Sequence, residues 1–217
     1  MRAGFWRIYA ACYDLAWDSP ATTALAQRIA RELPVRTLVD VGCGTGLTAA
    51  PLVARGVRVH GVDASPAMLR RARNADRISA GSVQEASATG LAAQSVDAAL
   101  CANVLHLHPA PAAVLDELVR LVRPGGRIAV VTPADGLQHR TVLRADLKSG
   151  RGLVRSVIAH LTRQMIGLVA AVTGISVRDG SEVRAHLDDA VVRHALHVIA
   201  QGEVAELQRF TVMAVPD

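Results

Sequence analysis

A glycine-rich turn directly after an apolar run is the part of the sequence best suited to chemistry. Residues 38–48 read Leu-Val-Asp-Val-Gly-Cys-Gly-Thr-Gly-Leu-Thr, so Asp40 precedes glycines at alternate positions, Gly42, Gly44 and Gly46. A glycine lets a ligand approach the backbone, and the N–H groups that open a following helix can bind it. The pattern predicts a nucleotide-type site at the first crossing of an open α/β sheet.

A second acid, Asp63, ends the next apolar run, 21 positions after Gly42. An acid at that place accepts hydrogen bonds from the ribose hydroxyls of a bound nucleoside. The dinucleotide fingerprint G-x-G-x-x-G requires a third glycine where this chain has Leu47. A Tyr-x-x-x-Lys dehydrogenase pair is also absent, because Arg144 stands four residues before the single lysine, Lys148. A diphosphate cradle is therefore disfavoured.

The elements predicted around these residues alternate between strand and helix, as a parallel sheet with right-handed crossovers requires. We predict strands at 35–41, 57–62, 78–82, 96–102 and 127–132. Helices are predicted between them at 45–55, 68–75 and 110–122, and a turn at 124–126. Ser65 and Pro66 suit the cap and the first residue of the second helix.

The flanking regions differ in pattern from this core. Residues 3–33 are predicted to be helical with a break near Ser19, and residues 134–174 to be mostly helical and basic. A short helix at 181–189 is followed by β-rich runs at 191–200 and 210–215, which we expect to pair antiparallel. The fold class is therefore α/β, with a Rossmann-like seven-stranded sheet, mostly parallel, that ends in an antiparallel C-terminal hairpin.

Composition favours one folded domain over residues 1–217, because 51% of the residues are hydrophobic and 20% are charged. Cys12, Cys43 and Cys101 lack CxxC spacing, so we expect no metal site and no disulfide framework, and a cytoplasmic location. No signal peptide or bilayer-spanning run is apparent. The net charge of +5 equals the surplus of residues 139–165 alone, and the balanced remainder argues against a nucleic-acid partner.

Four motifs in order resemble the class I S-adenosylmethionine-dependent methyltransferases, in particular the small-molecule branch typified by ubiquinone-type enzymes. The resemblance covers about residues 35–132. Its motifs are Val39–Gly46 after the first strand, Gly61–Met68 around the acidic loop, Ser95–His106 at the fourth strand and its exit, and Leu115–Gly126 before the fifth strand.

The resemblance implies S-adenosyl-L-methionine as cofactor, S-adenosyl-L-homocysteine as product and a small-molecule methyl acceptor. It assigns the methionine part to Asp40, Gly42, Cys43, Gly44 and Gly46, the ribose to Asp63, the adenine side to Ala64 and Met68, and the floor under the sulfonium to Ala102 and Asn103. One departure concerns the adenine amino group. Where the family often has Gly-Asp-Ala, this chain has Gly81-Ser82-Val83, so Ser82 would accept that bond more weakly and the Val83 N–H would reach the ring.

Two histidines follow the fourth strand, in the place where the family often has an adjacent pair. His106 keeps the first of those positions, and an unperturbed imidazole titrates near 6.5, which suits a general base. His106 is the candidate catalytic residue and a candidate substrate contact. The alternative is that His106 and His108 are packing or surface residues.

Five of the six aromatic residues lie among the first seventeen, and Trp6, Tyr9, Tyr13 and Trp17 share one helical face. The N-terminal helices at 1–33 either pack on the sheet or form a lid. A lid would exclude water and turn rings toward the sulfonium cation. In the lid interpretation Tyr13 contacts the cofactor, while Tyr9 and Trp17 contact the substrate.

The basic segment 134–174 occupies the place where the family inserts a substrate cap, and residues 175–217 form the hairpin region. Three interpretations remain open: a cap helix packed on the sheet, a pocket for an acidic or aromatic small molecule that includes His139, or a helix on an anionic membrane. The favoured function is methyl transfer to an O, N or C atom of a small molecule, with a specialised metabolite as the expected acceptor. The alternatives are a phospholipid N-methyltransferase, a non-catalytic S-adenosylmethionine-binding protein and a nicotinamide enzyme, and the oligomeric state is open.

Overall fold

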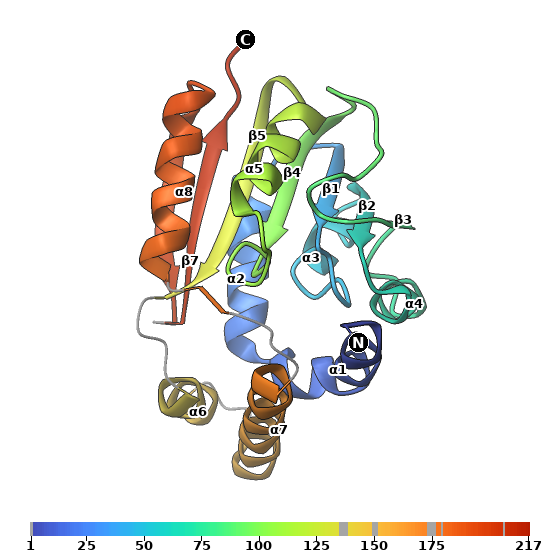
Figure 1. The fold of residues 1–217 in the computed structure, drawn as a ribbon, viewed down its shortest axis with the longest axis vertical. Helices are drawn as coiled ribbons and strands as arrows, with labels where there is room; N and C mark the ends of the chain where they lie inside the picture. Colours follow the sequence, from blue (N-terminus) through green and yellow to red (C-terminus); the bar gives the residue numbers. More distant parts are fainter. Residues whose placement is uncertain (1, 135–138, 149–151, 173–176, 179, 206) are drawn as a thin grey trace.

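The computed structural model describes residues 2–134, 139–148, 152–172, 177–178, 180–205 and 207–217. Its strands form one seven-stranded sheet in the order β3-β2-β1-β4-β5-β7-β6 (Figure 1). Strands β1 to β5 pair in parallel, whereas β7 runs antiparallel to both β5 and β6, which confirms the predicted fold class. The bounds are β1 Thr37–Val41, β2 Arg58–Asp63, β3 Ala80–Val83, β4 Val96–Ala102, β5 Val122–Pro133, β6 His197–Val204 and β7 Gln208–Ala214.

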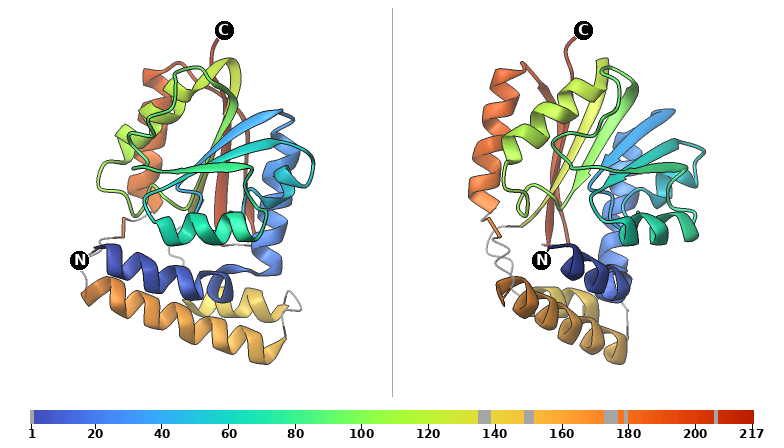
Figure 2. Two further views of the ribbon diagram at one scale, coloured as in Figure 1. Left: turned by 90° about the vertical axis from the view of Figure 1, so that its right-hand side faces the viewer. Right: turned by 45° about the vertical axis from the view of Figure 1, so that its right-hand side comes forward.

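Helices cover both faces of the sheet and its carboxyl end (Figures 1 and 2). Apolar side chains of α2, α3 and α4 join one buried cluster with the sheet, and those of α5 and α8 join the other. A third group, α1, α6 and α7, lies beyond the carboxyl ends of the parallel strands. The helices are α1 Arg2–Trp17, α2 Pro20–Glu32, α3 Ala50–Val53, α4 Pro66–Asn74, α5 Pro111–Leu121, α6 His139–Lys148, α7 Leu153–Val172 and α8 Gly180–Arg193.

Burial on both faces explains the apolar runs of the central strands. In β1, Leu38 belongs to one buried cluster and Val39 and Val41 to the other. In β4, Leu100 and Cys101 are divided in the same way. Alternating side chains therefore stabilise opposite layers, as in parallel sheets with helices on each side.

The helix predicted at 45–55 is largely wrong. Only Ala50–Val53 forms a helix, and tight turns precede it, with the Gly46 N–H donating to the Cys43 carbonyl at 2.9 Å. Pro51 lacks an N–H and cannot make the backbone bond that a helix starting at residue 45 requires there. The N–H groups around the glycines therefore belong to a loop, and the expected helix N-terminus is absent from this place.

Two boundaries near the C-terminus also differ from prediction. Helix α8 extends to Arg193, and β6 begins only at His197. Val183, Leu187 and Ala190 are buried at helical spacing, so packing overrides the β-propensity of the valines at 191 and 192. The predicted turn at 124–126 instead forms a bulge in β5, because Val96 pairs with Val122 but Ala98 pairs with Arg127.

Within the described ranges, no helix has the length and hydropathy needed to cross a bilayer. No group of three or more His, Cys, Asp or Glu residues suited to a metal ion occurs among the same residues. The N-terminal helices and the basic helices predicted at 134–174 are observed as α1, α2, α6 and α7.

Candidate functional site

The loop between β1 and α3 contains three glycines, and all have positive φ: 71° at Gly42, 54° at Gly44 and 77° at Gly46. A Cβ at Gly42 would lie 2.3 Å from a methyl group of Val104, and one at Gly46 would lie 2.7 Å from the Cβ of Arg77. Both contacts are shorter than side-chain packing allows. The sequence pattern thus reports a backbone shape that only glycine adopts without strain.

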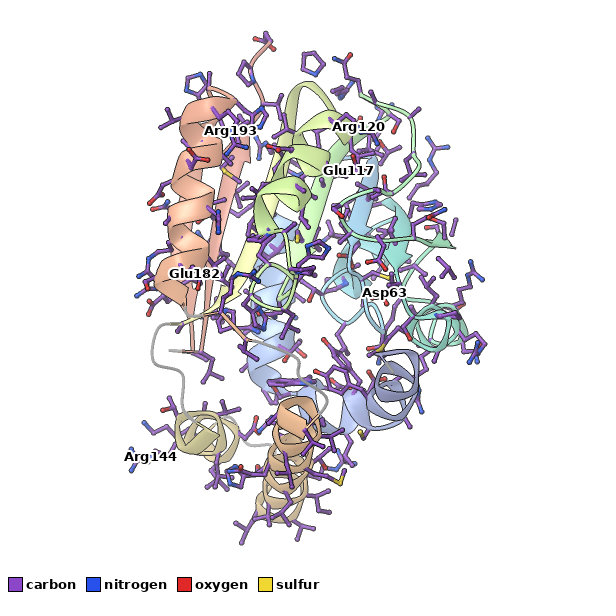
Figure 3. The ribbon with its side chains drawn as sticks, viewed as in Figure 1. Asp63, Glu117, Arg120, Arg144, Glu182 and Arg193 are labelled. Carbon is purple, nitrogen blue, oxygen red and sulfur yellow. The ribbon has the colours of Figure 1, made fainter. Side chains whose placement is uncertain are left out.

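Asp63, at the end of β2, is hydrogen-bonded to this loop. Its Oδ2 accepts a hydrogen bond from the Gly44 N–H at 2.8 Å, and its Oδ1 accepts one from the Ser65 N–H at 2.8 Å. Figure 3 shows Asp63 between the glycine loop and α4. Burial raises the pKa of Asp63, and the two N–H groups oppose that shift. Each oxygen retains a further acceptor direction for a ligand hydroxyl.

Asp40 lies at the carboxyl end of β1 and is 1% exposed. Its Oδ1 has no hydrogen-bond partner among the described residues. Burial, and then the charge of Asp63, raise the pKa of Asp40 to about 8. The same two charges contribute to raising the pKa of Tyr13, after burial. A cationic ligand would stabilise the ionised form of these two buried carboxyl groups.

The exit of β4 carries two more buried polar atoms. Asn103 has φ of 59°, and its N–H donates to the Val131 carbonyl at 2.9 Å. The Asn103 Oδ1 and the His106 Nδ1 are buried without a partner in the described part of the chain. Ala102 packs beside them against the core. Unpaired buried acceptors cost stability, so their presence here indicates a ligand site.

Arg178 lies in the segment between α7 and α8 and hydrogen-bonds the chain that follows β4. The sequence did not single out this residue. Its backbone N–H donates to the His106 carbonyl at 2.8 Å. Its guanidinium donates to the carbonyls of His108 and Pro109. A separation of about seventy residues leaves no local pattern that predicts the contact.

Helix α1 is tied to the glycine loop through Asp14. Its carboxylate accepts from the Thr45 hydroxyl at 2.6 Å and from the Arg77 guanidinium at 2.9 Å. The ring of Tyr13 lies over the loop, because a Cβ at Gly44 would be 3.7 Å from its Cζ. The sequence predicted a cofactor contact for Tyr13 but gave no sign of the bonds that Asp14 makes to Thr45 and Arg77.

The predicted substrate contacts are only partly described. Tyr9 and Tyr13 meet edge to face with centroids 5.1 Å apart, and Trp17 donates from Nε1 to the Tyr9 hydroxyl at 2.9 Å. The guanidinium of Arg163 lies 5.1 Å from the Trp17 ring centroid. The side chains of Trp6 and His139 lie outside the described residues.

The residues predicted to line the adenine side differ in exposure and in polarity. Ser82 hydrogen-bonds His60 Nε2 at 3.0 Å, so its hydroxyl already has a partner. Val83 is 50% exposed and Ala64 is exposed, while Met68 is buried at the start of α4. The Cys43 thiol points into the core and is buried against Gly61, so only the Cys43 backbone faces the loop.

Comparison with known proteins agrees with this geometry. Residues 39–130 match the family described as methyltransferase domain. The chain is 34% identical over 102 residues to the ubiquinone biosynthesis O-methyltransferase of Cupriavidus pinatubonensis (strain JMP 134 / LMG 1197), covering 45% of this chain and 41% of that protein. It is 38% identical over 139 residues to the trans-aconitate 2-methyltransferase of Azoarcus sp. (strain BH72), covering 57% and 54%.

A crystal structure of a SAM-dependent methyltransferase from Aquifex aeolicus has the same fold, with a TM-score of 0.60, 19% identity, and coverage of 91% of this chain and 94% of that one. Residues 39–130 therefore form a methyltransferase domain that is similar to those of class I S-adenosylmethionine-dependent enzymes. The chain spans about half the length of the two curated methyltransferases, 41% and 54%.

The family's cofactor is S-adenosylmethionine, and the residues at this methyltransferase site fit it. The buried, unpaired oxygens of Asp40 and Asn103 suit a ligand with a cationic end. The carboxylate of Asp63, held by two N–H groups, suits a ribose diol. Gly44 carries no side chain, and the ring of Tyr13 lies next to the place where its Cβ would be, so Tyr13 would contact a ligand bound at this loop.

Replacing Tyr13 tests how far α1 contributes to cofactor binding. We expect Tyr13→Ala to weaken S-adenosylhomocysteine binding about tenfold, because the ring that lies over Gly44 is lost. Isothermal titration calorimetry measures the change, and Leu15→Ala, an exposed position of the same helix, is the control. Equal affinity of both variants and the parent protein would contradict a cofactor contact by Tyr13.

Burial of His106 makes the stability of the methyltransferase depend on pH. Desolvation lowers the pKa of His106 from 6.5 to about 4, so the unfolded chain binds a proton there before the folded one does. The free energy of unfolding should therefore fall by about 3 kcal/mol at this site as pH decreases from 6.5 to 4. Urea titrations across this window should show a smaller decline for His106→Gln; an equal decline would contradict the shift.

Proposed function

We propose that this methyltransferase transfers the methyl group of S-adenosylmethionine to a small molecule. The observation that supports this most directly is that Asp40, Asp63 and Asn103 lie at the carboxyl ends of the neighbouring strands β1, β2 and β4. The loop beside them contains three glycines with positive φ. Ligands of open α/β sheets bind at that edge. The curated relatives named above methylate small molecules according to their names, which agrees with this substrate class.

In this proposal each part of the cofactor has its own residues. Asp40 and the loop backbone bind the methionine part, and Asp63 binds the ribose. Ala102 and Asn103 lie under the sulfonium. Ala64, Met68, Ser82 and Val83 line the adenine side, where the bond between Ser82 and His60 argues for contact through the Val83 backbone. Helix α1 forms the lid, whereas α2, which was also predicted to belong to it, packs on a face of the sheet. Helices α6 and α7 form the cap.

The chemistry asks mainly for alignment and the exclusion of water. When bound, S-adenosylmethionine supplies a methyl group on a sulfonium, which a nucleophile displaces in line. Holding the two reactants in that geometry can lower the barrier by up to about 7–11 kcal/mol. Tyr9, Tyr13 and Trp17 would exclude water on the side of α1, in contact with one another. A bound cation would lower the raised pKa values of Asp40 and Asp63 and be stabilised by their ionised carboxylates.

His106 is the residue proposed to accept a proton from the nucleophile. Its lowered pKa keeps the imidazole neutral at pH 7, and its buried Nδ1 is unpaired among the described residues. We expect His106→Ala to lower turnover about 100-fold or more while cofactor affinity changes less than twofold. Single-turnover methyl transfer and calorimetry measure the two quantities. Unchanged turnover with the true acceptor would remove His106 from the mechanism.

The experiment that tests the function has two stages. Calorimetric titration with S-adenosylhomocysteine and, separately, with NAD first distinguishes a methyltransferase from a nicotinamide enzyme. Tritiated S-adenosylmethionine and a fractionated small-molecule extract then identify a labelled product. Binding without transfer to any fraction would favour a non-catalytic cofactor-binding protein, and absence of S-adenosylhomocysteine binding would overturn the proposal.

A further inference from the structure

Helix α7 presents an apolar face to solvent along its whole length. Large apolar side chains between 40% and 78% exposed occupy this face, namely Leu153, Val154, Val157, Ile158, Leu161, Met165, Leu168 and Val172. At about 100° per residue, these positions fall within an arc of about 140° on one side of the helix. We call this set the outer face of α7. Apolar surface of this continuity marks an interaction site.

The opposite side of α7 is small and polar, and it is the side that is buried. Ser156, Ala159, Thr162 and Arg163 are at most 8% exposed. This side packs against α1 and α6, and Arg163 donates to the carboxylate of Asp146 at 2.7 Å. The helix therefore buries its polar side and exposes its apolar side, which is the reverse of a helix that packs in water. The outer face has no described partner in this chain.

Exposed basic residues lie on α6 and α7, the helix that carries the outer face, and neither helix has an exposed acid. Arg144, Lys148 and Arg155 are exposed, whereas the one acid between residues 139 and 172, Asp146, is buried against Arg163. Figure 3 shows Arg144 projecting from α6 away from the rest of the molecule. An apolar strip together with unopposed positive charge matches the interface of a bilayer that contains anionic lipids.

We propose that the outer face of α7 docks on an anionic membrane surface. With 20 residues, α7 is about 30 Å long, and it would lie in the plane of the interface with its apolar side chains below the headgroups. In both views of Figure 2, α1 lies between α7 and the sheet, so α7 is on the outside of the molecule. The exposed side chains of Arg144, Lys148 and Arg155 would contact lipid phosphates.

Charge argues against a second copy of this chain as the occupant. A two-fold interface places the same surface on both partners. The exposed basic residues of α6 and α7 would then meet each other with no exposed acid in the segment to offset them. An anionic surface neutralises the same charges. Membrane docking needs no methyl transfer, so this proposal and the proposed function stand or fall separately.

The test uses sedimentation of the full chain with vesicles of phosphatidylcholine and phosphatidylglycerol in equal parts, and with phosphatidylcholine alone. We expect sedimentation with the anionic vesicles only, and its loss as NaCl rises from about 0.1 M to about 1 M. Leu161→Ser combined with Leu168→Ser should weaken partition about tenfold or more. The control is Val192→Ser on α8, an apolar position that is 81% exposed.

Folding of every variant is checked by circular dichroism and by S-adenosylhomocysteine titration. Arg144→Gln combined with Lys148→Gln should reduce binding to anionic vesicles and leave the fold unchanged. The proposal is overturned if the parent protein does not sediment with anionic vesicles, or if the double serine variant sediments as the control does. It is equally overturned if the parent protein is a dimer in analytical ultracentrifugation and the double serine variant is a monomer.

Discussion

Asp63→Asn is expected to weaken S-adenosylhomocysteine binding about 100-fold. The Asp63 carboxylate accepts hydrogen bonds from the N–H groups of Gly44 and Ser65, so its remaining acceptor directions are fixed toward the ligand. An amide keeps one acceptor oxygen and turns an NH₂ group toward one of those N–H groups. Loss of one charge-assisted bond to a ribose hydroxyl, about 1.5–3 kcal/mol, corresponds to roughly 10- to 160-fold and accounts for a change of this size.

Asp97→Asn provides a matched control at the other end of the sheet. Asp97 accepts from the N–H groups of Arg36 and Thr37 at 2.9 and 3.0 Å and pairs with Arg123. Its replacement should lower stability and leave cofactor affinity unchanged within a factor of two. Calorimetry at one temperature and pH compares both variants with the parent protein. If both variants bind equally well, Asp63 does not hold the cofactor.

The features predicted correctly are those that a short stretch of chain determines by itself. Ser65 caps α4 by accepting from the Met68 N–H, and Pro66 begins that helix, as their types predict. The glycines at 42, 44 and 46 have the positive φ angles that their spacing suggested. Local chemistry therefore sufficed for the glycine turn after the first strand and for the alternation of strands and helices along the core.

The features missed depend on residues far apart in the sequence. Asp14 meets Thr45 and Arg77 across separations of 31 and 63 residues, and no local pattern encodes such a pairing. Pro51 was included in a predicted helix because apolar spacing outweighed its missing N–H. The valines at 191 and 192 favoured a strand until packing of α8 decided otherwise.

The orientation of the cap helix illustrates the same limit. The sequence of residues 152–173 is amphipathic, and amphipathic helices usually bury their apolar side. This property favours the first interpretation of the segment, a cap helix whose apolar side packs on the sheet. In the structure, α7 packs on α1 and α6 through its polar side. The decisive interaction is the buried pair of Arg163 and Asp146, which joins α7 to α6 and which periodicity does not reveal.

Breaking that pair should have the largest effect on stability. Asp146 and Arg163 are 1% and 3% exposed, and their side chains meet at 2.7 Å. Asp146→Asn removes the carboxylate that lies against the buried guanidinium, and breaking such a pair costs about 3–5 kcal/mol. For a chain of this length we expect a fall in Tm of roughly 6–20 °C, measured by scanning calorimetry. Protease cleavage should increase first in α6 and α7.

Two further variants separate the loss of charge balance from a general effect of mutation. Asp189→Asn breaks an exposed pair with Arg193, which solvent screens, and should leave Tm nearly unchanged. Asp146→Leu combined with Arg163→Met removes both buried charges and should recover most of the lost stability, because no unpaired charge remains in the interior. A Tm for Asp146→Asn equal to that of Asp189→Asn would show that the pair does not hold the cap. Failure of the double variant to recover would instead assign the loss to the Arg163 contact with the Ala16 carbonyl, which joins α7 to α1.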